Sequence, residues 1–198
     1  MSCLPQAAIK DRRITMRRSV SVTLLVASQL ALWGNTPALA DAKDNWDHFS
    51  DYATYSLAAT ALALPAWDKD WEGIKEATYS MGAAGIVGEM GKAAVHEQRP
   101  DHSGDDSFPS NHAAVAFAAA TNLTIRYGQQ AALPSFGVAS AIALGRVQAD
   151  KHYWHDVLAG AALGSLSGYL LTTKLDDDLA LMPLLSPHET GLLVTMRW

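Results

Sequence analysis

The sequence predicts an all-α fold, a helix bundle of about five to six helices with one short strand at the C-terminal end. Two observations favour this class. Long Ala- and Leu-rich stretches follow one another between residues 52 and 175, and clusters of Gly, Pro and Asp separate them. Ala is the strongest helix former, and Ala and Gly at this density are typical of helices that pack closely together.

Five helices follow from this pattern. The first is rich in Ala and Leu with scattered Tyr, Ser and Thr, the third is dominated by Ala, and the fourth carries Pro134, which suits the first turn of a helix. The clearest break is the cluster RPDHSGDDSFP at residues 99–109. The helices are expected over residues 52–67, 71–95, 112–127, 133–147 and 155–175.

The C-terminal segment, residues 191–198, has a different pattern. From residue 194 onwards, the apolar residues Val, Met and Trp alternate with Thr and Arg, which is typical of a strand. A single strand cannot close a barrel, so this segment is expected to pack on the helical domain.

The first 40 residues have the layout of a secretory signal peptide. A basic region precedes a mostly apolar stretch at residues 19–33, and Ala38 and Ala40 then mark a cleavage site. The apolar stretch is shorter than the roughly 20 residues that a spanning helix needs. We therefore expect residues 1–40 to be removed and residues 41–198 to form one exported, periplasmic domain. An uncleaved membrane anchor is the alternative.

Charge and cysteine content exclude several classes of protein. The full chain carries a formal net charge of −5, and residues 1–40 hold five basic residues and one acid, so the processed chain carries −9. An acidic exported protein is a poor candidate for nucleic-acid binding, and no nucleic-acid partner is expected. Cys3 is the only cysteine, so the processed chain has no disulfide, thiol nucleophile or cysteine metal ligand.

The sequence leaves the relation of the domain to a membrane open. Several helical segments are apolar over about 15–18 residues, near the lower limit for spanning a bilayer. Tyr, Ser, Thr and Asn interrupt them, and Ala contributes little to membrane insertion. We favour buried helices in a soluble or peripherally attached domain, with a small polytopic membrane protein as the alternative.

The first of three short motifs is KAAVHEQRP at residues 92–100. Lys92 and Arg99 lie seven residues apart, close to two helical turns, so they are expected on one face of a helix that Pro100 ends. Two cations near a helix end can bind a dianion, Arg through paired contacts and Lys as a point charge. Alone, the motif fits a solvated basic face better.

The second motif, PSNH at residues 109–112, precedes the Ala-rich third helix. Ser110 or Asn111 is a natural N-cap, and the free backbone N–H groups of a helix start can bind an anion. The Ser110 hydroxyl adds one donor, and His112 is placed to deliver a proton at the rim of such a site. Alone, the motif is a capped helix with a surface histidine.

The third motif, RVQADKHYWHD at residues 146–156, pairs His152 with Asp156 four residues later, on one face of an expected helix. A carboxylate can hold one ring nitrogen protonated and leave the other free as a nucleophile. Arg146 is near enough in the chain to join the same pocket, whereas His155 is expected to point elsewhere. The ordinary alternative is a His–Asp pair at a helix start.

Metal catalysis is not expected. Histidines and aspartates supply many candidate ligands, but the sequence has no His-Glu-x-x-His pattern. Three cations in the same place would also repel a metal ion. Asp105 and Asp106 are expected in an exposed loop, and no residue is assigned to a metal or a cofactor.

Together the three motifs resemble the type 2 phosphatidic acid phosphatase family, within the vanadium haloperoxidase superfamily. The family pattern is Lys-x6-Arg-Pro, then Pro-Ser-Gly-His, then Ser-Arg-x5-His-x3-Asp. The chain departs from it twice, with Asn111 in place of the glycine and Gly145 in place of the serine. The motifs otherwise match at Lys92, Arg99, Pro100, Pro109, Ser110, His112, Arg146, His152 and Asp156.

The resemblance implies a metal-independent phosphatase. In this scheme His152 attacks phosphorus and forms a phosphohistidine, Asp156 orients His152, and His112 protonates the leaving alcohol and later activates water. Asn111 tolerates unusual backbone angles but is expected to narrow the pocket, and Gly145 removes a hydroxyl that would help to orient the arginine. The phosphate oxygens would be held by Lys92, Arg99, Ser110, Asn111 through its backbone, and Arg146.

The expected substrate is a phosphomonoester or diphosphate, either a lipid phosphate at a membrane or a small soluble ester. Two alternatives stay open. The same residues could hold vanadate in a haloperoxidase, although a short chain without large insertions fits the phosphatase better. The chain could also be a non-catalytic, exported helical interaction module, although the intact polar residues of the motifs argue against decay.

Overall fold

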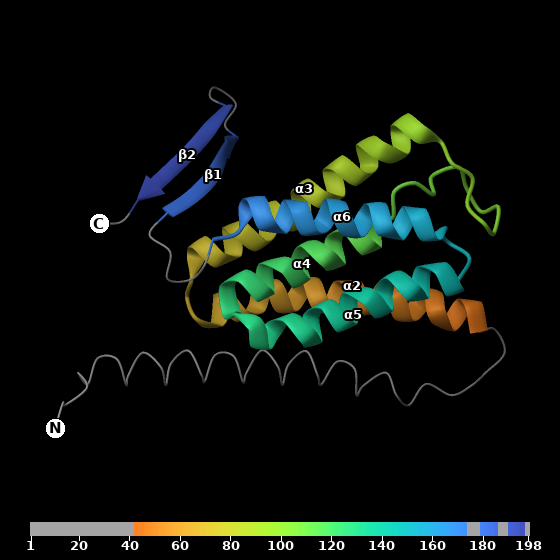
Figure 1. Cartoon of the computed structure of the whole chain (residues 1–198), viewed down its shortest axis with the longest axis horizontal. Helices are drawn as coiled ribbons and strands as arrows, with labels where there is room; N and C mark the ends of the chain where they lie inside the picture. Colours follow the sequence, from red (N-terminus) through yellow and green to blue (C-terminus); the bar gives the residue numbers. More distant parts are fainter. Residues whose placement is uncertain (1–41, 174–178, 186–189, 197–198) are drawn as a thin grey trace.

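The computed structural model describes residues 42–173, 179–185 and 190–196, and five helices make up most of this part (Figure 1). The all-α prediction is confirmed, because helices alone build the described core. The expected signal peptide and its cleavage site lie outside the described residues. The helices are α2 Ala42–Trp67, α3 Trp71–Val95, α4 Asn111–Tyr127, α5 Gln129–Gln148 and α6 Trp154–Leu171.

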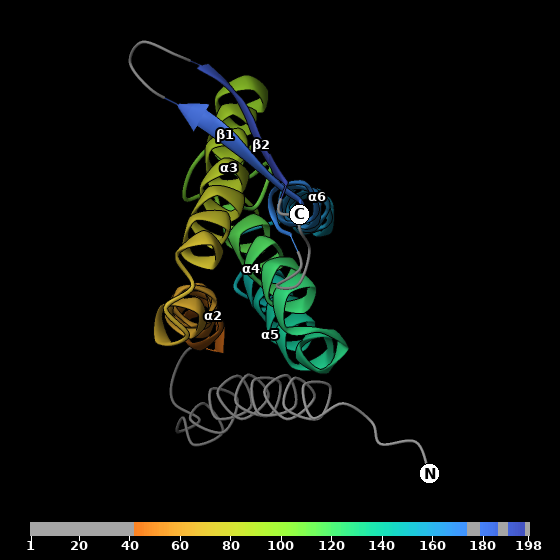
Figure 2. The same cartoon turned by 90° about the vertical axis from the view of Figure 1, so that its left-hand side faces the viewer.

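Helix α4 lies at the centre of the bundle, and the other four helices all contact it. In both ribbon views α3 and α6 lie on one side of α4, and α2 and α5 lie on the other (Figures 1 and 2). The sequence explains this place, because the many alanines of α4, among them Ala113, Ala116 and Ala120, are fully buried. Their small side chains let neighbouring helices approach α4 closely.

Glycines make the contact between α6 and α4 especially close. Gly160, Gly164 and Gly168 recur every four residues along α6 and all face α4. A Cβ atom added to Gly164 would overlap the carbonyl oxygen of Ala114, and one added to Gly160 would overlap that of Ser110. Any larger residue at these positions would therefore push the two helices apart.

The first helix is longer than the sequence predicted. Helix α2 begins at Ala42 rather than at residue 52, so it includes an acidic first turn with Asp44. Negative side chains are favourable at a helix start because of the helix dipole. The added segment carries Asp47 and Asp51, which contribute to the site described below.

The fourth and fifth helices also have different bounds. Helix α5 begins at Gln129, so Pro134 lies inside it and not in its first turn as predicted. The reason is Gly128, whose φ of 86° suits glycine and lets α5 follow α4 without a longer loop. Helix α6 ends at Leu171, before the predicted end at residue 175.

Two strands follow the helices, β1 Leu179–Leu185 and β2 Thr190–Met196, and they form an antiparallel pair. The register places Leu179 opposite Met196 and Leu185 opposite Thr190.

The strand predicted over residues 191–198 coincides with β2 as far as residue 196. Its partner β1 was not predicted, because β1 contains Pro183 and lacks the alternation of polar and apolar residues that marks a strand.

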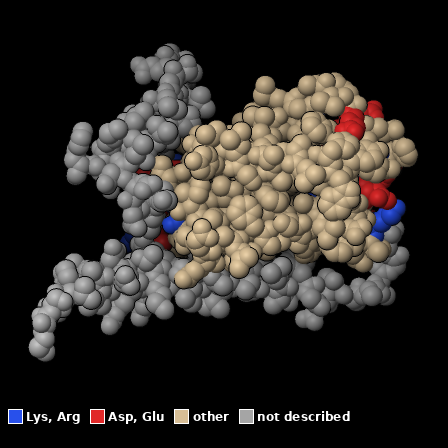
Figure 3. Space-filling model, viewed as in Figure 1, with Lys and Arg blue, Asp and Glu red and all other residues tan. Residues whose placement is uncertain are grey.

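One face of the described surface separates charged from uncharged regions. On the face shown in Figure 3, the visible Lys, Arg, Asp and Glu side chains lie near the two ends of the bundle, and the middle carries none. None of the described helices combines the length and the hydropathy that a bilayer-spanning helix needs.

Candidate active site

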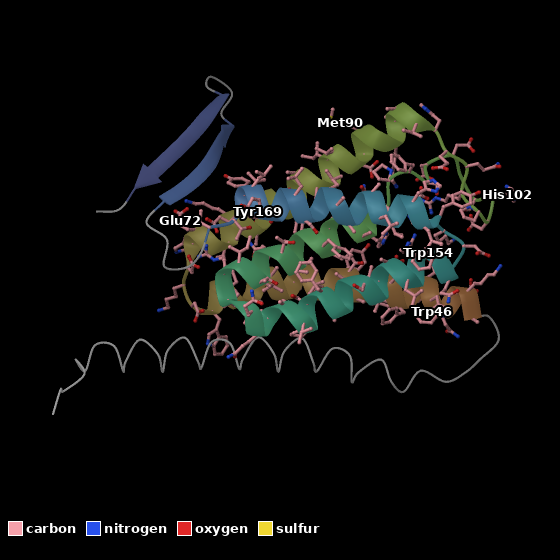
Figure 4. The ribbon with its side chains drawn as sticks, viewed as in Figure 1. Trp46, Glu72, Met90, His102, Trp154 and Tyr169 are labelled. Atoms are coloured by element: carbon pink, nitrogen blue, oxygen red, sulfur yellow. The ribbon has the colours of Figure 1, made fainter. Side chains whose placement is uncertain are left out.

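The three sequence motifs come from different elements but meet at one end of the bundle. Lys92 lies in the last turn of α3, Ser110 caps α4, Arg146 lies in the last turn of α5, and His152 lies just before α6. Figure 4 marks this end with three labelled side chains from α2, the loop after α3, and α6: Trp46, His102 and Trp154.

The two cations of the first motif converge on a carboxylate. Arg99 donates from Nε to Oδ1 of Asp106 at 2.8 Å and from Nη2 to Oδ2 at 2.9 Å, and Lys92 Nζ lies 3.4 Å from Oδ2. The hydrogen bonds from Arg99 lower the pKa of Asp106 to about 2, and the charges of Arg99 and Lys92 add to this effect. Asp106, which was expected in an exposed loop, is therefore the partner of both cations.

The two cations do not share a helix face, and this prediction was wrong. Helix α3 ends at Val95, because His96 takes the left-handed backbone conformation with φ 49° and its N–H donates to the carbonyl oxygen of Lys92. This cap ends the helix before Pro100 can do so. Arg99 thus lies in the loop after α3 and reaches the site from there.

Ser110 caps α4 as one of the two predicted N-caps. Its Oγ accepts from the N–H of Ala113 at 3.5 Å. The N–H of Ser110 donates to the carbonyl oxygen of Asp156 at 3.1 Å. This bond joins the start of α4 to the start of α6, which brings the second and third motifs together.

Asn111 is the first residue of α4 and does not need a positive φ, so its replacement of glycine puts no strain on the backbone. Its side chain is turned towards α3, where Nδ2 donates to Glu89 and Oδ1 lies over Gly88. A Cβ atom at Gly88 would overlap Asn111 Oδ1, so glycine is needed there. The N–H of Asn111 belongs to the helix start, where N–H groups lack intrahelical partners and can bind an anion.

His112 is held by an aspartate that the sequence analysis did not single out. Its Nε2 lies 2.8 Å from Asp51 Oδ1, and 26 % of its side chain is exposed. Burial lowers the pKa of His112 to about 4, with further lowering from the charges of Arg146 and Lys92. His112 is therefore neutral at pH 7 in the ligand-free protein.

Arg146 is buried and bound by the first turns of α2. Its Nη1 lies 2.6 Å from Asp47 Oδ1, 3.0 Å from Asp51 Oδ1 and 3.3 Å from Ser50 Oγ. Its Nε is buried and has no hydrogen-bond acceptor among the described residues. Because buried donors in proteins are nearly always paired, this N–H is available to an acceptor that a ligand supplies.

The second departure from the family pattern has a structural reason. A Cβ atom at Gly145 would lie 3.2 Å from Ser50 Cβ and 3.3 Å from the carbonyl oxygen of Trp46. A serine at position 145 would therefore crowd α2, whereas Gly145 lets α2 approach α5. The hydroxyl of Ser50 lies next to Arg146, so α2 supplies the hydroxyl that position 145 lacks.

His152 is almost fully buried, with 1 % of its surface exposed. Its Nδ1 lies 2.8 Å from the carbonyl oxygen of Ser107. Because a carbonyl oxygen can only accept, Nδ1 carries the proton and Nε2 keeps its lone pair. Burial lowers the pKa of His152 to about 3, with further lowering from Arg146 and Arg99, so the ring is neutral at pH 7.

Asp156 contributes less directly to His152 than predicted. The two residues do not share a helix, because α6 begins only at Trp154. Asp156 Oδ2 lies 3.5 Å from His152 Nδ1 but accepts shorter hydrogen bonds from Ser107 Oγ at 2.5 Å and from the Tyr153 N–H at 2.8 Å. Asp156 therefore fixes the Ser107 segment, and the carbonyl of Ser107 holds the histidine.

One group of described side chains has the geometry to hold a metal ion. Ligand atoms of Glu97, His155 and Asp156 all lie within 4.8 Å of one another. His155 Nε2 is 2.9 Å from Glu97 Oε1 and 3.0 Å from Asp156 Oδ1, and its ring stacks on Tyr153. Among the described residues, the charged partners of His155 are Glu97 and Asp156, and His155 shares Asp156 with the His152 side of the site.

Comparisons with known proteins agree with the three motifs. The sequence pattern of the PAP2 superfamily matches residues 74–178. Lipid A 1-phosphatase of Porphyromonas gingivalis is 37 % identical over 93 residues, which cover 46 % of this chain and only 21 % of that protein. Decaprenylphosphoryl-5-phosphoribose phosphatase of Mycobacterium tuberculosis is 30 % identical over 163 residues, which cover 76 % of this chain and 88 % of that protein.

A solved structure shows the same fold. The crystal structure of Aquifex aeolicus LpxE has a TM-score of 0.57 and 22 % sequence identity, with coverage of 71 % of this chain and 92 % of that one. The chain spans about a fifth of the lipid A 1-phosphatase but most of the mycobacterial phosphatase. From the match over residues 74–178 and from these relatives, we conclude that the chain belongs to the PAP2 superfamily, in which the curated relatives that it matches are phosphatases.

Proposed function

We propose that the chain is an exported, metal-independent phosphatase that hydrolyses phosphomonoesters or diphosphates through a phosphohistidine. One observation carries this proposal. His152 is a buried neutral imidazole that keeps its proton on Nδ1, against Ser107, and lies in the field of Arg99 and Arg146. A free Nε2 lone pair near two guanidinium groups is suited to attack the phosphorus of a bound phosphate ester.

In the first step, His152 Nε2 bonds to phosphorus while the bond from phosphorus to the leaving oxygen breaks. Lys92, Arg99 and Arg146 neutralise the charge that spreads over the other phosphate oxygens. The Nε of Arg146, which has no acceptor among the described residues, supplies one donor for them. His112 gives its proton to the leaving oxygen.

His112 takes up a proton from the solvent when the substrate binds. Nearby cations contribute to its pKa of about 4 in the free protein. A phosphate dianion offsets those cations and so raises the pKa of His112 in the complex. The negative charge of the substrate thus favours the protonated form of His112, which acts as the acid in the first step.

In the second step, water attacks the phosphohistidine. The now neutral His112 takes a proton from this water as its oxygen bonds to phosphorus. The bond between His152 and phosphorus breaks, which restores the neutral imidazole and releases phosphate. Every proton and electron pair in the cycle is accounted for by the two histidines, the ester and water.

The relatives support a lipid substrate. The two curated relatives are named for phosphorylated lipids, lipid A and decaprenylphosphoryl-5-phosphoribose. We therefore propose a lipid phosphate as the preferred substrate, with a small soluble ester as the alternative. The signal peptide predicted over residues 1–40 supports export to the periplasm, where the domain would reach such lipids by peripheral membrane association.

The test is phosphate release by the purified full chain from a panel of lipid and soluble phosphate esters, with EDTA present. We expect His152→Ala to lower turnover by at least about 10³-fold, because the nucleophile is lost. His48→Ala is the matched control, since His48 is an exposed histidine of α2 outside the convergent cations.

Two results would contradict the proposal. If a folded His152→Ala protein keeps the turnover of the parent chain, the phosphohistidine mechanism is contradicted. If EDTA abolishes activity and a divalent metal restores it, metal independence is contradicted, and Glu97, His155 and Asp156 become the candidate metal ligands.

A further inference from the structure

Asp106 occupies the two cations of the first motif. Its two carboxylate oxygens receive paired hydrogen bonds from Nε and Nη2 of Arg99, and Lys92 adds a longer contact. Arginine binds two oxygens of a phosphate group with the same paired geometry. The Asp106 carboxylate thus sits where two phosphate oxygens would bind.

The loop that carries Asp106 is anchored independently of this carboxylate. The N–H of Arg99 donates to the carbonyl oxygen of Gly104 at 2.8 Å, and the N–H of Ser107 donates to that of Glu97 at 2.9 Å. Gly104 also leaves room for the carboxylate, because a Cβ atom there would lie 2.8 Å from Asp106 Oδ1. The Asp106 side chain can therefore leave the cations while backbone bonds keep the loop in place.

The carboxylate covers the cations from the solvent side. The Asp106 side chain is 49 % exposed, whereas Lys92 and Arg99 are 13 % and 18 % exposed. An ion pair with a half-exposed partner is weak, because water competes for its charges. A phosphate dianion carries more charge than a carboxylate and can replace it at Arg99 and Lys92.

We propose that Asp106 is an intramolecular competitor of phosphate, which occupies Arg99 and Lys92 in the free protein and must swing into solvent before a phosphate group binds. This inference rests on the proposed function of the same site. In this scheme Asp106 helps to set the affinity of the site for phosphate. When the carboxylate returns to Arg99 and Lys92, it also helps to displace the phosphate product.

The competition has a measurable cost. Only molecules with Asp106 displaced can bind phosphate, so the apparent dissociation constant equals the intrinsic one divided by the fraction of molecules in which Asp106 is displaced. After displacement, the negative carboxylate stays near the bound anion and repels it. Both effects disappear when the carboxylate is replaced by a neutral amide.

The test is titration calorimetry of the full chain with inorganic phosphate. We expect Asp106→Asn to bind phosphate about fivefold or more tightly than the parent chain, because the closed state and the repulsion are removed. The matched control is Asp105→Asn, since Asp105 is exposed and forms no ion pair within the described part of the chain. It removes the same charge from the neighbouring position and should leave the affinity within about twofold.

Two outcomes would overturn the inference. If Asp106 instead holds Arg99 in the geometry that phosphate needs, Asp106→Asn binds phosphate equally or more weakly. If the effect is only a change in net charge, Asp105→Asn gains as much as Asp106→Asn. Circular dichroism spectra of both variants confirm that each is folded.

The calorimetric result is separate from the proof of catalysis. Tighter phosphate binding by Asp106→Asn in a chain that hydrolyses no ester would support the competition and contradict the phosphatase. Hydrolysis that depends on His152, with phosphate binding unchanged in Asp106→Asn, would support the phosphatase and contradict the competition.

Discussion

Asp51 joins two residues of the candidate site, because its Oδ1 contacts both His112 and Arg146. The contact fixes Nε2 of His112 and leaves the other ring nitrogen, Nδ1, for proton exchange with a ligand. The partners of the two imidazoles differ, a carboxylate for His112 and a backbone carbonyl for His152. This difference supports the separate roles proposed for them, proton donor for His112 and nucleophile for His152.

The role of His112 predicts a dependence on the leaving group. We expect His112→Asn to lower kcat by about 10²–10⁴-fold on an alkyl phosphate, whose leaving oxygen needs a proton. The loss should be much smaller on 4-nitrophenyl phosphate, whose leaving group is stable as an anion. Steady-state kinetics on the two substrates decide the matter, and equal losses on both would mean that His112 does not act as the acid.

The spacing of the motifs predicted Lys92, Arg99, Arg146 and His152 at one site, and the structure brings their elements together. It did not predict the Ser107 carbonyl, because any residue offers a backbone carbonyl and only the fold places it. The remaining partners had a weak signal in the sequence. Asp47, Ser50, Asp51 and Asp106 are ordinary acids and hydroxyls whose role depends on long-range contacts.

The close packing of helix α6 on α4 helps to position the residues of the candidate site. Its glycines let it lie directly on α4, and the contact between Gly160 and Ser110 joins the second turn of α6 to the start of α4. The bond from the Ser110 N–H to the Asp156 carbonyl depends on this approach. The distance between the second and third motifs therefore depends on the glycines of α6, which are packing residues.

We predict that Gly164→Ala destabilises the protein by about 1–3 kcal/mol or more, since the added methyl group overlaps backbone atoms of α4. Gly82→Ala is the matched control, because a Cβ atom there has nothing within 4 Å. It should stabilise α3 by about 0.5–1 kcal/mol through helix propensity. Urea unfolding measures both changes, and equal stability of the two variants would contradict the packing argument.

At the scale of elements, the sequence predicted the five helices of the described residues and most of their extent. It misplaced the start of α2, because the charged and aromatic first turns lack the Ala-rich composition of the rest. It also extended the α3 face to Arg99, because the left-handed conformation of His96 leaves no mark in the sequence. Both errors concern helix ends that form part of the site. At these ends tertiary contacts, rather than local helix propensity, determine where the helix begins or ends.

The stability of the whole molecule is expected to depend on pH because of its two buried histidines. Their pKa values are about 4 for His112 and about 3 for His152, below the ordinary 6.5. Between pH 6.5 and 4 the unfolded chain therefore binds more protons than the folded one. The stability that these residues contribute is complete above pH 6.5 and is lost as the pH falls towards 4.

We predict that the free energy of unfolding falls on acidification from pH 6.5 to 4.5, by up to about 1.4 kcal/mol per pH unit for each histidine. Urea unfolding at several pH values measures the slope, and His112→Gln should reduce it. Asp106 does not interfere, because its pKa shift from 3.8 to about 2 acts at lower pH. A free energy that stays constant over this range would contradict the burial of both rings.

Each of the five described helices contributes at least one side chain or cap to the same end of the bundle. Removal of α2 alone would strip Arg146 of its carboxylate partners, Asp47 and Asp51. If the proposed activity is confirmed, we expect turnover to require the intact tertiary assembly, and we expect a protease cut that frees one helix to abolish it. A screen that scores colour from a chromogenic ester would sort variants by correct folding as well as by chemistry.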